Sequence, residues 1–130
     1  MNNRSQITKP HLFNQDNQVT VYERNNPDDK FYGRIYRIVN IKTNAYVKSS
    51  PYVDHFYISF DQSVYHSILK RGWNVIYNGR VAIIGNIIRN DDDKITELFI
   101  QYNSNPYVEM PIHLEYINAI LIWRDGFVIE

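Results

Sequence analysis

Residues 75–89 read Val-Ile-Tyr-Asn-Gly-Arg-Val-Ala-Ile-Ile-Gly-Asn-Ile-Ile-Arg, and this stretch decides the fold class. Asn78-Gly79 stands between two segments of β-branched and aromatic side chains. A two-residue type I′ turn needs positive φ at both central positions, which Asn-Gly adopts readily. The stretch therefore predicts two antiparallel strands, Trp73–Tyr77 and Arg80–Arg89, joined by a tight turn.

The composition of the whole chain has the same preference for β structure. Ile (18), Val (10) and aromatic residues (19) far outnumber Leu (5) and Ala (3). β-Branched and aromatic side chains suit a pleated surface, whereas Leu and Ala favour helices. We therefore predict an all-β protein. The frequent Asn and Ile are also typical of AT-rich genomes, including those of many phages and viruses.

Charge and length exclude several classes of protein. The chain has 130 residues with 14 basic and 14 acidic side chains, so no net charge recruits nucleic acid or anionic lipid. It has no cysteine, and no apolar run approaches the length of a membrane-spanning helix. The segment Met1–Gln6 lacks the apolar core of a signal peptide, so we expect a cytoplasmic protein, in the host cytoplasm if it is viral.

A polar arm at residues 1–17 precedes closely spaced strand candidates. Besides the two strands named above, these are Val19–Arg24, Phe31–Ile41, Tyr46–Lys48, His55–Phe60, Ile95–Tyr102, Ile112–Leu114, Asn118–Trp123 and Phe127–Ile129. One helix is predicted over 61–71, with Asp61 as its cap and Gly72 as its stop. Its apolar stripe consists of Val64, Tyr65, Ile68 and Leu69.

The chain also contains an internal repeat. Pro51-Tyr52-Val53-Asp54 recurs as Pro106-Tyr107-Val108-Glu109, and Ile58-Ser59-Phe60-Asp61 as Ile112-His113-Leu114-Glu115. Gly33, Ile35, Arg37 and Lys42 match Gly85, Ile87, Arg89 and Lys94 at one constant offset. Glycine inside a strand permits a bulge or a sharp bend. The repeat predicts two units, 18–71 with the helix at its end, and 72–130.

Each copy resembles the small five-stranded barrels, the SH3-like and Sm-like folds. The second copy carries the resemblance, because a helix leads into Val75-Ile76-Tyr77, the Asn78-Gly79 turn, the Gly85-containing strand and a loop with Asp91. No Arg-Gly stands at the second Sm motif position, where the chain reads Tyr116-Ile117-Asn118-Ala119-Ile120. The resemblance implies two pseudo-repeated small β-barrel units with one short helix between them.

No catalytic pattern is found among the titratable residues. His11, His55, His66 and His113 lack the close spacing of metal ligands, and no nucleophile or phosphate-binding motif occurs. Asp91-Asp92-Asp93 lacks the remaining ligands of a calcium loop. We therefore expect no enzyme activity and no cofactor or metal. A site formed in space by the histidines or by the repeated carboxylates stays open at this point.

The most suggestive surface lies on the strand Phe31–Ile41. If that strand is regular, Tyr32, Arg34 and Tyr36 share one face, with Arg37 beside them. Tyrosine and arginine together suit the stacking of nucleic acid bases and are equally enriched in protein-binding hot spots. An ordinary strand whose tyrosine hydroxyls reach solvent has the same pattern.

The repeated Pro-Tyr-Val segments give a second candidate surface. Proline cannot donate to a β ladder, so Pro51 and Pro106 are expected in loops just before strands. Tyr52 and Tyr107 would then either cover the barrel mouths as lids or form a recognition edge.

These observations favour a non-catalytic binding module, such as a regulator or an accessory protein of a phage or virus. Its expected partner is a protein, with self-association as one case and no membrane contact. The alternative is binding of single-stranded nucleic acid through Tyr32, Arg34, Tyr36 and Arg37, which the zero net charge makes weaker.

Overall fold

A computed structural model describes residues 13–40, 45–47, 49–50, 55–123 and 126–130. Ten strands form one antiparallel sheet, and a separate two-stranded pair joins β1 (Phe13–Asn14) to β5 (Ser49–Ser50). The ten strands are β2 (Gln18–Glu23), β3 (Phe31–Asn40), β4 (Ala45–Val47), β6 (His55–Phe60), β7 (Asn74–Tyr77), β8 (Arg80–Arg89), β9 (Ile95–Tyr102), β10 (Asn105–Ile112), β11 (Ile117–Trp123) and β12 (Phe127–Ile129). The helices are α2 (Gln62–Ile68) and the 3₁₀ turn η1 (Leu114–Tyr116).

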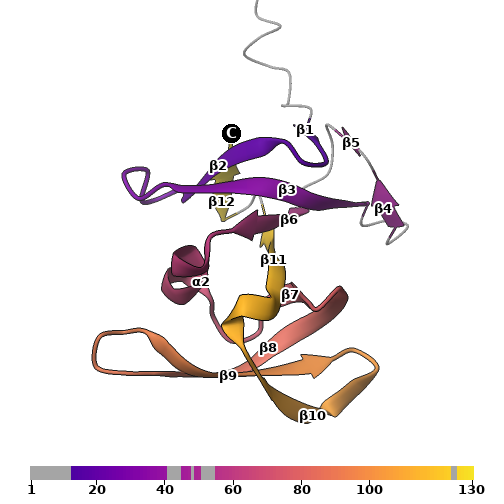
Figure 1. The fold of residues 1–130 in the computed structure, drawn as a ribbon. Coiled ribbons are helices and arrows are strands. Elements are labelled where there is room, and N and C mark those ends of the chain that lie inside the picture. Colours follow the sequence, from indigo (N-terminus) through magenta and orange to yellow (C-terminus); the bar gives the residue numbers. More distant parts are fainter. Residues whose placement is uncertain (1–12, 41–44, 48, 51–54, 124–125) are drawn as a thin grey trace, which may run out of the picture.

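The sheet is continuous and open. Its strand order is β10-β9-β8-β7-β11-β6-β3-β2-β12, and β4 extends the edge of β3. Strand β11 joins the two parts of the chain, because Ile120 stands opposite both Ile58 of β6 and Val75 of β7. Figure 1 shows α2 beside β11, between the β2–β3 end and the β8–β9 end of the sheet. The all-β prediction is confirmed, whereas the described strands do not close into two barrels.

The division into units 18–71 and 72–130 stays a prediction, and strand pairing crosses it twice. Strand β11 pairs with β6, and β12 pairs with β2, so C-terminal strands lie on strands of the first half. Loop-closure entropy normally favours pairing between sequence neighbours. Here the long-range pairs join both halves into one sheet.

Most sequence-predicted strands are found within one or two residues, and the Asn78-Gly79 turn has the predicted positive φ at both positions, 49° and 81°. The exception is β10. Ile112–Leu114 was expected as a strand, but the strand runs from Asn105 to Ile112, and Leu114 begins η1. Pro106 therefore lies in a strand and not in a loop. Proline is tolerated there because β10 is an edge of the sheet.

The two repeated glycines, Gly33 and Gly85, have different structural roles. Between β8 and β9 the register shifts between Ile84 and Asn86, so Gly85 is at a bulge. Between β3 and β6 the shift falls at Tyr36, three residues after Gly33. A Cβ atom on Gly33 would lie 2.7 Å from Ile58 Cγ2 and 2.8 Å from the Phe60 ring. Gly33 thus leaves room for the Ile58 and Phe60 side chains of β6 in the core.

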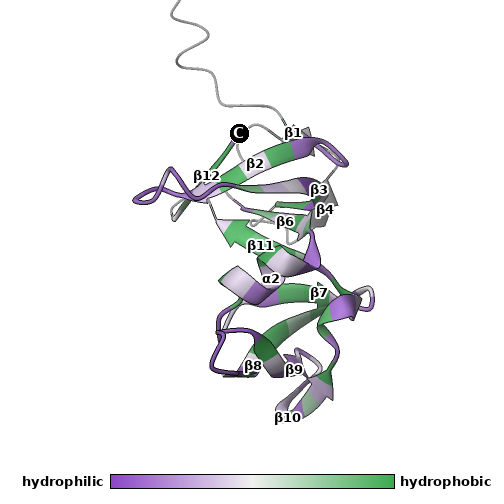
Figure 2. Cartoon of the chain, turned by 60° about the vertical axis from the view of Figure 1, so that its left-hand side comes forward, coloured by the Kyte–Doolittle hydropathy of each residue, from purple (hydrophilic) through white to green (hydrophobic). Residues whose placement is uncertain are grey.

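One hydrophobic core spans both halves of the chain. It contains Val21, Ile35 and Ile58 from the first half and Val75, Ile84 and Ile100 from the second, all at most 1% exposed. Figure 2 shows hydrophobic residues on β6, β11 and β7 along the middle of the sheet and hydrophilic residues on the loop between β2 and β3. Burial of these Ile and Val side chains is the main stabilising contribution.

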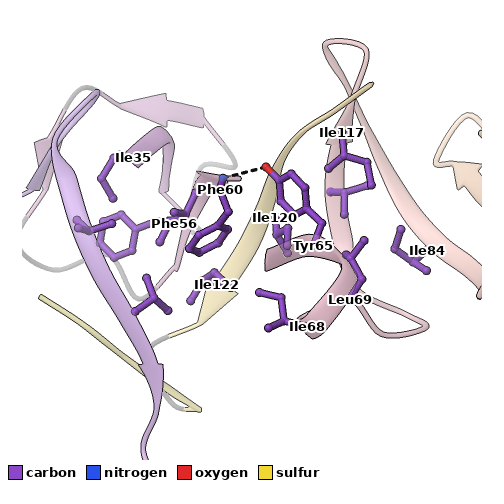
Figure 3. Packing of buried hydrophobic residues seen from close by; sticks show 14 of the residues in the cluster. Ile35, Phe56, Phe60, Tyr65, Ile68, Leu69, Ile84, Ile117, Ile120 and Ile122 are labelled. Atoms are coloured by element: carbon purple, nitrogen blue, oxygen red, sulfur yellow. Dashed lines mark hydrogen bonds between the residues drawn. The ribbon is translucent and has the colours of Figure 1, made fainter. Parts of the chain in front are cut away.

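Helix α2 packs against this core, and its predicted apolar stripe is confirmed. Tyr65, Ile68 and Leu69 are buried, and Val64 packs against the cluster. Figure 3 shows Tyr65, Ile68 and Leu69 between Phe56 and Phe60 of β6 on one side and Ile84 and Ile117 on the other. Asp61 occupies the N-cap position, but its side chain makes no capping hydrogen bond, contrary to the role predicted for it.

The Tyr65 hydroxyl connects three elements. It accepts a hydrogen bond from the Phe60 backbone N–H at 3.0 Å and donates one to the Asn118 carbonyl of β11 at 3.3 Å. Burial of the ring raises the pKa of the Tyr65 hydroxyl above its ordinary value near 10. The neutral form is therefore the one that the folded protein stabilises.

Replacing Tyr65 by phenylalanine is expected to lower the free energy of unfolding by about 1–3 kcal/mol at pH 7, because the Phe60 N–H loses its buried acceptor. A raised folded-state pKa stabilises fully below pH 10, and the contribution is lost as the pH rises through it. The gap between wild type and variant should therefore narrow above pH 10. Urea denaturation at pH 7 and at about pH 10.5 measures it. A constant gap would contradict this assignment.

Candidate functional site

An open groove of about 530 Å³ crosses the outer face of the sheet over β2, β3 and β6. Its floor is a row of three residues aligned across the strands, Val19, Gly33 and Phe60. The side chains on both sides of this row are Gln18, Thr20, Tyr32, Arg34, Ser59 and Asp61. We call these nine residues the β2–β3–β6 groove.

The register of the strands explains which side chains enter the groove. Thr20 stands opposite Tyr32, while Gln18 and Ser59 both stand opposite Arg34. Side chains two residues apart in a strand point to the same face, so Tyr32 and Arg34 project together. Tyr32 is 71% exposed, and Arg34 is exposed as well. This half of the predicted Tyr–Arg surface is therefore accessible to a ligand.

The groove is polar and electrically balanced. Arg34 is the one cation among its described lining residues and Asp61 is the one carboxylate. Thr20, Gln18 and Ser59 add hydroxyl and amide groups that can donate and accept hydrogen bonds. Such a lining suits a ligand with mixed charge and with backbone-like hydrogen-bonding groups.

Tyr36 and Arg37 do not line this groove, and their part in a binding surface stays a prediction. The bulge at Tyr36 interrupts the alternation of faces, so Ile35 and Ile38 are both buried. Tyr36 packs against a small cluster centred on Tyr57, Ile76 and Ala119. The Arg37 guanidinium lies 5.2 Å from the Tyr36 ring centroid. Both side chains are half-buried and stabilise the sheet locally.

Tyr107 does not act as a lid. Tyr107 is 95% exposed on β10, at the opposite end of the sheet from β2 and β3, and thus covers nothing. Tyr52 lies outside the described residues. The recognition-edge interpretation of Tyr107 stays a prediction.

The described histidines lie in two places, with His55 apart from His66 and His113. His55 is buried and stacks on Trp123, and His66 on α2 accepts a hydrogen bond at Nδ1 from the Ile95 backbone N–H at 3.1 Å. His66 and His113 line one polar hollow of about 260 Å³, together with Glu97 and Glu115. Across the ranges that the structure describes, no three His, Asp or Glu side chains are grouped so that they could hold a metal ion.

The sequence did not indicate the other side chains of the β2–β3–β6 groove. Gln18, Thr20 and Ser59 enter it through cross-strand register, which depends on the bulge and on the loop lengths. Asp61 was interpreted as a helix cap, and its exposed carboxylate was therefore not considered as a ligand contact. The alternation of polar and apolar residues in Gln18-Val19-Thr20-Val21 was the available signal, because it assigns Gln18 and Thr20 to the outer face.

Within the described ranges, no helix is long and apolar enough to cross a membrane. Comparison with known proteins finds no matching family model, no matching curated protein and no matching solved structure.

Proposed function

We propose that this protein is a non-catalytic binding module that holds an extended segment of a partner protein in the β2–β3–β6 groove. The observation that carries the proposal is the accessible Tyr32–Arg34 pair in an open groove whose other lining side chains are mostly polar. Tyrosine and arginine are the residue types that contribute most to protein interfaces. An extended backbone would find partners in Gln18, Thr20 and Ser59.

The electrostatics favour a protein partner over nucleic acid. Binding of a phosphate backbone depends on several lysine or arginine contacts. The groove offers Arg34 as its cation, and the carboxylate of Asp61 lines the same surface and repels phosphate. A peptide with one acidic and one basic side chain would complement both groups.

The first test is selection from a random peptide library displayed on phage, with the full chain immobilised, followed by calorimetric titration of the enriched peptides. Tyr32→Ser is expected to weaken peptide binding at least tenfold, because the exposed ring is lost while folding is unaffected. Tyr116→Ser is the control, since it removes another exposed tyrosine that does not line the groove. Its affinity should stay within twofold of wild type.

Two results would overturn the proposal. In the first, the enriched peptides bind the Tyr32→Ser variant as tightly as the wild type. In the second, no peptide is enriched, while a labelled oligothymidine binds with strong salt dependence, which would establish the nucleic-acid alternative.

We also infer that the two halves are copies of one small-barrel unit that now share a sheet. Two matched segments support this inference. Ile58–Asp61 ends β6 and leads into α2, and Ile112–Glu115 ends β10 and leads into η1. In the second half, β11 returns to lie beside β7, as expected of the last strand of such a unit. A resemblance to SH3-like or Sm-like barrels stays a proposal.

A further inference from the structure

A second hollow lies where β7 begins, β11 ends and β12 begins. It has a volume of about 400 Å³ and is lined by Trp73, Trp123 and Phe127, with Leu121, Gly72 and Gly126 between them. We call it the aromatic pocket. It contains both tryptophans of the chain, and Asn74 is the one further lining residue among those described. Its size lies within the range typical of small-molecule sites.

The rings of the aromatic pocket are held in place before any ligand arrives. The Trp123 indole stacks on the His55 imidazole with a centroid distance of 3.7 Å and an angle of 23°, and His55 is 5% exposed. Trp73 and Phe127 pack edge to face at 6.1 Å. Fixed side chains lose little conformational entropy on binding, so such walls favour association.

The pocket is nevertheless open to a ligand. Trp123 is 44% exposed although it is one of the largest apolar side chains. A Cβ atom added at Gly72 or Gly126 would meet no heavy atom within 4 Å, so both glycines border open space. The described lining has no charged side chain, and Asn74 supplies one amide for a hydrogen bond.

We propose that the aromatic pocket binds a flat aromatic ring. Stacked and edge-to-face arrangements are the favourable geometries between such rings, and the three aromatic walls provide both. A free small molecule and an aromatic side chain of a partner share this chemistry.

Unlabelled indole is a suitable probe, because the two tryptophan Nε1–H signals of the ¹⁵N-labelled full chain both report on the pocket. We expect both signals to shift together and to saturate with one half-saturation point at or below about 1 mM. Trp123→Leu and Phe127→Leu should each weaken indole binding at least fivefold. Binding is followed by the Trp73 signal in Trp123→Leu and by both tryptophan signals in Phe127→Leu. Tyr116→Leu is the control, since it replaces another exposed aromatic side chain by leucine outside the pocket.

Shifts that do not saturate, or that persist unchanged in both pocket variants, would overturn the proposal. Tetramethylammonium distinguishes ring recognition from cation binding, because a tighter response to it than to indole would also contradict the proposal. The blocked peptide acetyl-Gly-Trp-Gly-amide then separates the two sources. Binding at least tenfold tighter than indole identifies a partner side chain, and weaker binding identifies a free small molecule.

Discussion

Replacing Ile120 by alanine is expected to lower the free energy of unfolding by about 2–5 kcal/mol, more than the loss expected for Tyr65→Phe. Ile120 is fully buried in the core. It stands opposite Ile58 and Val75, where the pairings of β11 with β6 and with β7 meet. The cavity left by the lost side chain would therefore border both halves of the sheet. Urea denaturation, followed by far-ultraviolet circular dichroism, measures the loss.

Ile88→Ala is the matched control for this variant. It makes the same change on β8 at a residue that is 40% exposed, so little cavity forms and the loss should stay below about 1 kcal/mol. Amide hydrogen exchange adds a spatial readout. In Ile120→Ala, protection should fall by a similar factor in β3 and in β8, because one core serves both. Loss of protection in one half alone, or two separate transitions, would show that the halves fold independently.

The strands were predictable where one face is buried. Segments such as 80–89 and 95–102 are rich in β-branched residues, and local propensity agrees with burial in the core. Strand β10 was missed because its residues 105–109 are all exposed and include Pro106. It pairs with β9 across a two-residue turn, but its exposed residues lack the alternating apolar pattern that indicates a strand.

The architecture was harder to predict than its elements. The repeat predicted two closed units, but the pairings of β11 with β6 and of β12 with β2 join segments that lie far apart in the chain. Such pairs depend on the total burial that the assembled sheet achieves. Pattern within a single strand does not determine which distant strand will lie beside it.

The candidate site was predictable only where it depends on a single strand. The adjacency of Tyr32 and Arg34 follows from the period of a strand and needs no further information. Tyr36 is absent from the groove because it packs against Tyr57, beside a bulge that adds one residue to β3 relative to β6. A bulge of this kind has no sequence signature at Tyr36 itself. The walls contributed by β2 and β6 required the register of three strands.

The glycines of the repeat provide the second large expected effect. Gly33→Ala should lower the free energy of unfolding by about 1–3 kcal/mol, because overpacking a well-packed core forces neighbours to move. The new methyl group would lie 2.7–2.8 Å from Ile58 and Phe60 side chains, both of which are buried. Neither the Ile58 nor the Phe60 side chain can move away without losing its packing in the core. Thermal denaturation of the variant measures the loss.

Gly85→Ala is the matched control, at the equivalent position of the second copy. Its Cβ atom would meet the carboxylate end of Glu109, an exposed and flexible side chain on the edge strand β10 that can swing into solvent. Removal of glycine also reduces the entropy of the unfolded chain, so this variant should lie within about 0.5 kcal/mol of wild type. Equal losses at both positions would mean that the two glycines serve one shared conformational requirement. Unequal losses in the expected order would mean that the copies have diverged in packing, since the first glycine makes room for core side chains and the second lies at a bulge.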